Sequence, residues 1–224
     1  MPKHFVSELA AYRSEAVFNP WGETDPQHDL DQQGAEVRRR QLQKYLSERI
    51  GRAKTLLLAE AIGYQGGHFS GIPMTSERLL LGGLKHKNLG PELVFSDLSP
   101  CRTSRPEVRP QGFTEPTATI VWGFLIEHGI DPRSVVLWNA FPWHPYKPEK
   151  GLLSNRTPSD AELVAGHRML RRMLELGQFE QIVAVGEKSA AQLQQLQITA
   201  TKVRHPANGG AGKFRTQMLA LLKS

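Results

Sequence analysis

Three polar side chains stand close to the ends of short apolar segments, and each suits a different chemical task. Glu60 can hold a water molecule or act as a base, the Asn139 amide can accept and donate hydrogen bonds at once, and His205 can donate to developing charge. Each alone has an ordinary explanation, as a loop cap, a strand-closing turn residue and a His-Pro turn. The three together indicate a functional site.

The segments that carry these side chains predict the strands of a parallel sheet. Residues 55–61, 134–140 and 181–186 are apolar runs without alternation, which is typical of strands buried on both faces, and a short strand is expected over 201–205. Because ligands of open α/β sheets bind beyond the carboxyl ends of the strands, the three side chains are expected to lie together.

Helical signals separate these strands and surround them. Apolar residues at helical spacing predict helices within residues 1–50, where the basic run at 38–40 is interpreted as a solvated helix face. Thr157 as a cap and Pro158 at the first position predict a helix that ends at Gly177, and another begins near Glu187. We therefore expect an α/β fold: one three-layer domain over 1–224, with a doubly wound, mainly parallel sheet of four to five strands flanked by helices.

Residues 96–116 form a polar segment with four prolines and are predicted to be a long loop. Its arginines, Arg102, Arg105 and Arg109, are balanced by acidic residues, so contact with DNA is the lesser of its two explanations.

Composition excludes several classes of protein. The single cysteine, Cys101, excludes an internal disulfide, a cysteine-rich zinc site and a four-cysteine iron–sulfur cluster, and no histidine pair has zinc-site spacing. We expect no metal and no other cofactor. No signal peptide or run of about 18 apolar residues is visible, so we expect a cytoplasmic protein without membrane contact, and a monomer.

Several short motifs, in order, resemble those of the uracil-DNA glycosylase superfamily, in a bacterial branch without an iron–sulfur cluster. Residues 59–63 (Ala-Glu-Ala-Ile-Gly) resemble the first motif, residues 71–77 the segment that follows it, and residues 205–210 (His-Pro-Ala-Asn-Gly-Gly) the second motif. Residues 138–145 resemble the family segment in which an Asn at the end of a strand forms hydrogen bonds to the base, and Asn139 stands at the place of that Asn. The resemblance extends from about residue 50 to 215.

This resemblance implies a DNA-repair hydrolase that flips uracil, or another deaminated base, out of DNA and hydrolyses the N-glycosidic bond to leave an abasic site. It assigns catalysis to Glu60 and His205. The implied base-binding residues are Asn139, Met74, Ile62, Gly63, Tyr64 and Phe69. The implied DNA-binding residues are Ser76, Pro142, His144, Arg204, Asn208, Gly209, Gly210 and Lys213. The implied partner is uracil-containing DNA, single- or double-stranded, and in a bacterium the protein would associate with the nucleoid.

The sequence also departs from the family pattern. Ala61 stands where the best-known branch has a catalytic Asp, and Met74 stands where a Phe usually stacks on uracil, a place that Phe69 or Phe141 could fill. Two other functions therefore stay open. One is a non-catalytic or weakly catalytic binder of uracil-containing or abasic DNA, and the other is an α/β enzyme that processes nucleosides.

The net charge of +6 is concentrated near the second motif. Residues 201–224 hold five basic and no acidic side chains, a charge of +5, whereas the other 200 residues hold 23 basic and 22 acidic ones, a charge of +1. This local field favours a DNA-facing surface around His205.

Overall fold

A four-stranded parallel sheet forms the centre of the protein. The structure is a computed structural model that describes residues 2–222. The strands are β2 (Thr55–Ala61), β3 (Val135–Phe141), β5 (Gln181–Val185) and β6 (Thr201–Val203), in the spatial order β3-β2-β5-β6. The predicted strands are confirmed, except that β6 ends two residues before His205. A small antiparallel pair, β1 (Val17–Phe18) with β4 (His144–Pro145), lies apart from this sheet.

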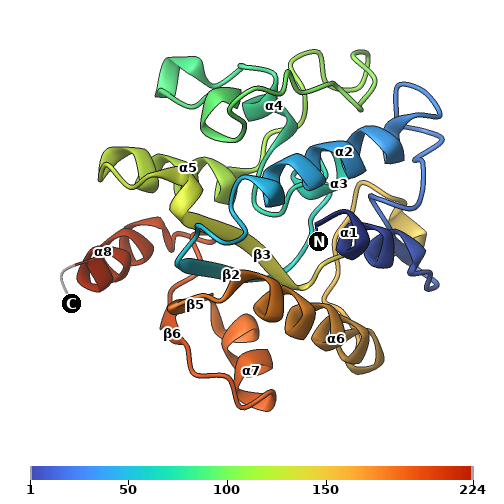
Figure 1. Ribbon diagram of the computed structural model, residues 1–224. Helices are drawn as coiled ribbons and strands as arrows, with labels where there is room; N and C mark the ends of the chain where they lie inside the picture. The colour runs from blue at the N-terminus through green and yellow to red at the C-terminus, as the bar shows by residue number, and fades with distance from the viewer. Residues whose placement is uncertain (1, 223–224) are drawn as a thin grey trace.

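Helices cover both faces of the sheet, as the doubly wound prediction requires. Figure 1 shows α2 and α5 on one side of the strands and α6 and α7 on the other. The chain moves from β2 outward to β3 and then back across β2 to β5, so these two crossovers lie on opposite faces, and the crossover from β5 to β6 continues in the second direction. The helices are α1 (Pro2–Ala11), α2 (Gly34–Ser47), α3 (Gly67–Ser70), α4 (Glu77–Leu80), α5 (Pro116–Glu127), α6 (Asp160–Gly177), α7 (Glu187–Gln195) and α8 (Ala211–Leu222), with 3-10 turns at 85–87, 91–93, 132–134 and 148–150.

Helix α6 ends at Gly177 as predicted, but its cap differs from the prediction. Ser159, not Thr157, is the N-cap: its Oγ accepts from the Glu162 backbone N–H at 3.3 Å, and the Glu162 carboxylate accepts from the Ser159 backbone N–H at 2.7 Å. This reciprocal capping box starts the helix two residues later than a cap at Thr157 would. The long loop is confirmed, since residues 96–115 contain no helix and no strand of the sheet.

The basic run in α2 is only partly a solvated face, which corrects the sequence prediction, since Arg40 is exposed but Arg38 is not. Arg38 is fully buried and forms a bidentate pair with Asp29, with Nη1–Oδ1 and Nη2–Oδ2 distances of 2.7 and 2.8 Å. The same guanidinium donates to the carbonyl oxygens of Pro20 and Glu23. Arg49 is buried as well and donates to the carbonyl oxygens of residues 45, 93 and 94. Hydrogen bonds from Nε and both terminal nitrogens offset the cost of burying the Arg38 charge, whereas Nε of Arg49 has no partner among residues 2–222.

A chain of buried polar contacts extends from this ion pair across the molecule. Asp29 accepts from the backbone N–H of Asp25, and the Asp25 carboxylate lies 3.1 Å from Nε2 of His68. Nδ1 of His68 lies 2.9 Å from Nδ1 of His144, whose Nε2 lies 2.7 Å from the Ser154 carbonyl oxygen. The chain therefore joins α2, the segment around α3 and the segment that follows β4.

The protonation of this chain follows from its burial. Burial lowers the pKa of His68 to about 4 and that of His144 to about 3, which favours the neutral form of each ring. Because the chain ends on an acceptor at both sides, one N–H on each ring leaves one of the three ring contacts without a proton. Burial opposes the charge of Asp25, but hydrogen bonds from His68 and His28 lower the pKa of that carboxyl group overall. The acceptors at the two ends of the chain are thus an ionised carboxylate and a backbone carbonyl.

Replacing Arg38 by Met is expected to destabilise the protein by about 3–5 kcal/mol, because Asp29 would stay buried without its counter-charge. Arg40→Met, on the exposed part of the same helix, should change the free energy of unfolding by less than about 0.5 kcal/mol. Urea denaturation followed by circular dichroism measures both. Equal midpoints for the two variants would contradict a structural role for the buried pair.

Candidate active site

A cleft of about 180 Å³ opens at the carboxyl end of β2. Its walls are residues 59–63 of β2 and the following turn, together with Met74, Glu115, Thr117, Asn155, Arg156 and His205. Five of the sequence-predicted site residues thus meet in one cavity, namely Glu60, Ile62, Gly63, Met74 and His205. They come from segments that are far apart in the sequence, and the parallel sheet brings the ends of β2 and β6 to the same edge.

His205 follows β6 and is held in one orientation by its own turn. Its Nδ1 accepts a hydrogen bond from the backbone N–H of Ala207 at 3.1 Å, so the ring proton is on Nε2. Burial and then the charge of Arg204 lower the pKa of the ring. Gly186, with φ of +100°, leaves room for the ring, since a Cβ there would lie 3.1 Å from the His205 Cβ. His205 is therefore a neutral imidazole with an N–H free to donate.

Glu60 brings a carboxylate to the same cleft. Its side chain is about one third exposed, and Oε1 lies 3.1 Å from Nζ of Lys188, which belongs to the first turn of α7. This pair keeps a negative charge at the cleft wall without closing the cleft. The neighbouring Ala61 supplies no second acid.

Asn139 lies beside the cleft rather than on its surface. It pairs with Ala59 across β2 and β3, and its side chain is buried. Its Oδ1 has no hydrogen-bond partner among residues 2–222. An unpartnered buried acceptor is costly, and such atoms are concentrated where a ligand completes the structure.

The residues around Met74 differ in how they relate to the cavity. Met74 is buried in the wall with a left-handed φ of +47°, and its carbonyl oxygen accepts from the Trp122 indole N–H at 3.1 Å. Phe69 is buried away from the cleft and stacks on Phe113 at 4.1 Å. The Tyr64 ring meets Phe113 edge-on, and the Tyr64 backbone N–H donates to Asn155 Oδ1 at 3.0 Å. Phe141, the other candidate for stacking, is fully buried and packs on Trp143.

The residues expected to contact DNA fall into two groups. Arg204, Asn208, Gly209 and Lys213 are exposed around the His205 turn, with the buried Gly210 among them. Ser76, Pro142 and His144 are buried, so they have no surface for DNA in this conformation. Ser76 caps α4 by accepting from the Leu79 backbone N–H, and the His144 ring contacts His68 within the buried polar chain.

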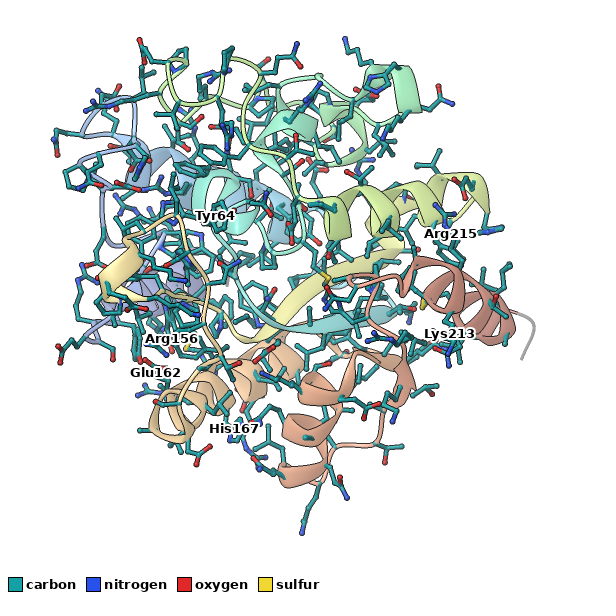
Figure 2. The ribbon with its side chains drawn as sticks, turned by 180° about the vertical axis from the view of Figure 1, so that it is seen from behind. Tyr64, Arg156, Glu162, His167, Lys213 and Arg215 are labelled. Atoms are coloured by element: carbon teal, nitrogen blue, oxygen red, sulfur yellow. The ribbon has the colours of Figure 1, made fainter. Side chains whose placement is uncertain are left out.

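Ion pairs neutralise part of the basic charge near the second motif. Lys202 pairs with Glu187 at 2.9 Å, and Arg215 pairs with Glu127. Arg204 and Lys213 form no ion pair within residues 2–222, and Lys223 lies outside the described residues. Figure 2 shows Lys213 and Arg215 on α8. The unpaired positive charge therefore flanks His205.

Four cleft residues were not predicted from the sequence: Glu115, Thr117, Asn155 and Arg156. Arg156 forms a bidentate pair with Glu162 at the start of α6, with N–O distances of 2.6 and 2.8 Å (Figure 2). These residues lie in or next to loops and carry no motif. The one available signal was the polar, Pro-flanked character of the segments around 115 and 155.

Within residues 2–222, no three His, Cys, Asp or Glu side chains are grouped so that they could hold a metal ion. None of the helices described there has the length and apolar character needed to span a membrane.

Comparisons with known proteins agree with this geometry. The crystal structure of wild-type SMUG2 from Pedobacter heparinus has the same fold, with a TM-score of 0.63 at 15% sequence identity; the match covers 100% of this chain and 99% of that one. No curated protein matches the chain. The model of the uracil DNA glycosylase superfamily matches residues 49–222, which include the whole sheet and every wall of the cleft. The chain therefore belongs to the uracil DNA glycosylase superfamily.

Proposed function

We propose that this protein is a monofunctional glycosylase that hydrolyses the N-glycosidic bond of uracil in DNA and leaves an abasic site. The observation that supports this most strongly is the convergence of Glu60 and His205 on one cleft at the carboxyl end of β2. A base paired inside a duplex cannot reach such a cleft, so the uracil nucleotide must be extruded from the stack.

His205 would stabilise the departing base. Cleavage of the N-glycosidic bond leaves the electron pair on uracil, and its O2 gains negative charge. The Nε2–H of His205 is free because Nδ1 is held by the Ala207 amide. A fixed neutral donor in a cavity with little water stabilises such charge without reorganising.

Glu60 would act on the other product of the cleavage, the sugar cation. Its carboxylate can orient the attacking water, accept a proton from it, or stabilise the cation electrostatically. Lys188, 3.1 Å away, holds the carboxylate at the cleft wall. Since Ala61 supplies no acid, Glu60 carries this role in the first motif.

Asn139 would identify the base once it is extruded. Its unpartnered Oδ1 can accept from uracil N3–H while its amide nitrogen donates to O4, whereas cytosine presents the opposite pattern. Because Asn139 lies behind the cleft lining, next to Ala59, a small movement of the cleft wall would accompany binding.

Oligonucleotides that carry U·G, U·A or single-stranded uracil are expected to yield alkali-labile abasic sites with the wild-type protein. His205→Ala should lower the single-turnover rate about 10²- to 10³-fold, since one donor to the leaving base is lost. His86→Ala, at an exposed 3-10 turn, is the matched control and should leave the rate unchanged.

The same assay separates the alternatives. No strand break with any substrate would overturn the proposal, and tight binding of uracil or abasic DNA without product would identify a non-catalytic binder. Release of uracil from free deoxyuridine but not from DNA would identify a nucleoside-processing enzyme.

Replacing Asn139 by Asp should lower uracil excision at least tenfold and allow some excision of cytosine. A carboxylate accepts from the cytosine amino group but cannot donate to uracil O4. Asn88→Asp, at an exposed turn, is the control. If Asn139→Asp released uracil and cytosine each at the rate that the wild type shows for that base, Asn139 would have no role in base recognition.

Lys213→Gln should weaken DNA binding and reduce the slope of log K against log salt concentration by about 0.9, the value for one phosphate contact on B-DNA. Arg215→Gln is the matched control on the same helix, since Glu127 already neutralises Arg215, and its slope should change less. Fluorescence anisotropy at several salt concentrations measures both. Identical slopes for wild type and Lys213→Gln would reassign Lys213 to the solvated surface.

A further inference from the structure

Glu115 brings a second carboxyl group to the cleft, in addition to that of Glu60. It has no role in the reaction steps proposed above. It lines the cavity together with Glu60 and His205. Glu115 stands at the N-cap of α5, where short polar side chains such as Asp or Ser commonly accept from a first-turn N–H, and its own side chain makes no such bond. Its Oε2 is enclosed and has no hydrogen-bond partner among residues 2–222. The side chain is therefore held in the cavity wall without a polar contact that would explain its position.

The packing around Glu115 leaves its carboxyl group close to the backbone of the turn that follows the first motif. A Cβ at Gly66 would lie 2.0 Å from Glu115 Oε2, so a larger residue there would displace the carboxyl group from this position. This part of the cleft wall is therefore formed by the Glu115 carboxyl group, which packs on the turn that follows β2.

The charged groups of the cleft are already neutralised by other partners. Glu60 pairs with Lys188, Arg156 pairs with Glu162, and the His205 ring is neutral. No cation of the cleft lining is left to balance a negative charge on Glu115. Burial raises the pKa of Glu115 to about 7, since nothing nearby stabilises the ionised form.

We propose that Glu115 takes part in the reaction as a neutral carboxylic acid, whose O–H donates a hydrogen bond to a carbonyl oxygen of the extruded base. This inference rests on the proposed glycosylase function. No proton needs to be transferred: the bond strengthens as the electron pair of the N-glycosidic bond moves onto the base.

The two carboxyl groups of the cleft then have different roles because their surroundings differ. Glu60, beside Lys188, is a carboxylate suited to the water and the sugar cation, and Glu115, without a cation, is an acid suited to the anionic base. Ionisation of Glu115 would remove a donor and place a negative charge beside the leaving anion. Excision should therefore slow as the pH rises through the pKa of Glu115.

Single-turnover release of uracil from a U·G oligonucleotide, measured from pH 5.5 to 9, tests the proposal. The wild-type rate should fall about tenfold per pH unit above pH 7. Glu115→Gln should lose this decline, because an amide donates at every pH, and Glu115→Ala should be at least tenfold slower at pH 6. Glu107→Gln, an exposed residue of the same loop, is the control and should follow the wild-type profile.

A decline that persists unchanged in Glu115→Gln, or a wild-type rate for Glu115→Ala at pH 6, would overturn the proposal. A readout without catalysis is the affinity for an oligonucleotide with 2′-fluoro-2′-deoxyuridine, which resists hydrolysis. That affinity should weaken above pH 7 in the wild type but not in Glu115→Gln. If no uracil is released but this pH-dependent binding persists, the glycosylase reaction is rejected and the hydrogen bond from Glu115 to the base is retained. If the binding does not depend on pH, the hydrogen bond from Glu115 is rejected.

Discussion

The buried ion pair between Arg38 and Asp29 anchors the polar chain that ends at Ser154, next to Asn155 in the cleft wall. A guanidinium without solvent contact is tolerated only when nearly all of its donors are used, and Arg38 uses Nε and both terminal nitrogens. Its partners fix residues 20–29, and through Asp25 they fix His68 and His144. These segments have little regular secondary structure, so side-chain hydrogen bonds take the place of a backbone ladder in orienting them.

The strands and the two catalytic candidates could be predicted because their signals are local. A strand buried on both faces consists of a continuous apolar run, and the polar residue that interrupts or closes such a run stands out. Glu60 and His205 were found in this way. Helix α5 was missed for the opposite reason: it is apolar on most of its faces, carries no capping side chain and follows a long loop.

The remaining features could not be predicted because they depend on partners distant in the sequence. A run of three arginines on a helix is usually solvated, and the pairing of Arg38 with Asp29 becomes visible only once residues 20–29 fold over α2. His144 is similar, because its partner His68 is 76 residues away. Glu115 appears in the sequence as one acid among several in a polar loop, and only the fold places it against Gly66 and the cleft.

Met74 shows how the fold maintains a strained residue at the site. A non-glycine residue with φ of +47° costs about 1–2 kcal/mol, which persists only where the surroundings determine the conformation. Here the Trp122 indole N–H is shared between the Met74 carbonyl and the Thr75 hydroxyl, at 3.1 and 3.2 Å. These contacts fix the backbone at Met74. In this conformation Met74 is part of the cleft wall. An unbranched side chain in this place can move aside for a base and then pack on its face, which a rigid ring could do only by a larger rotation.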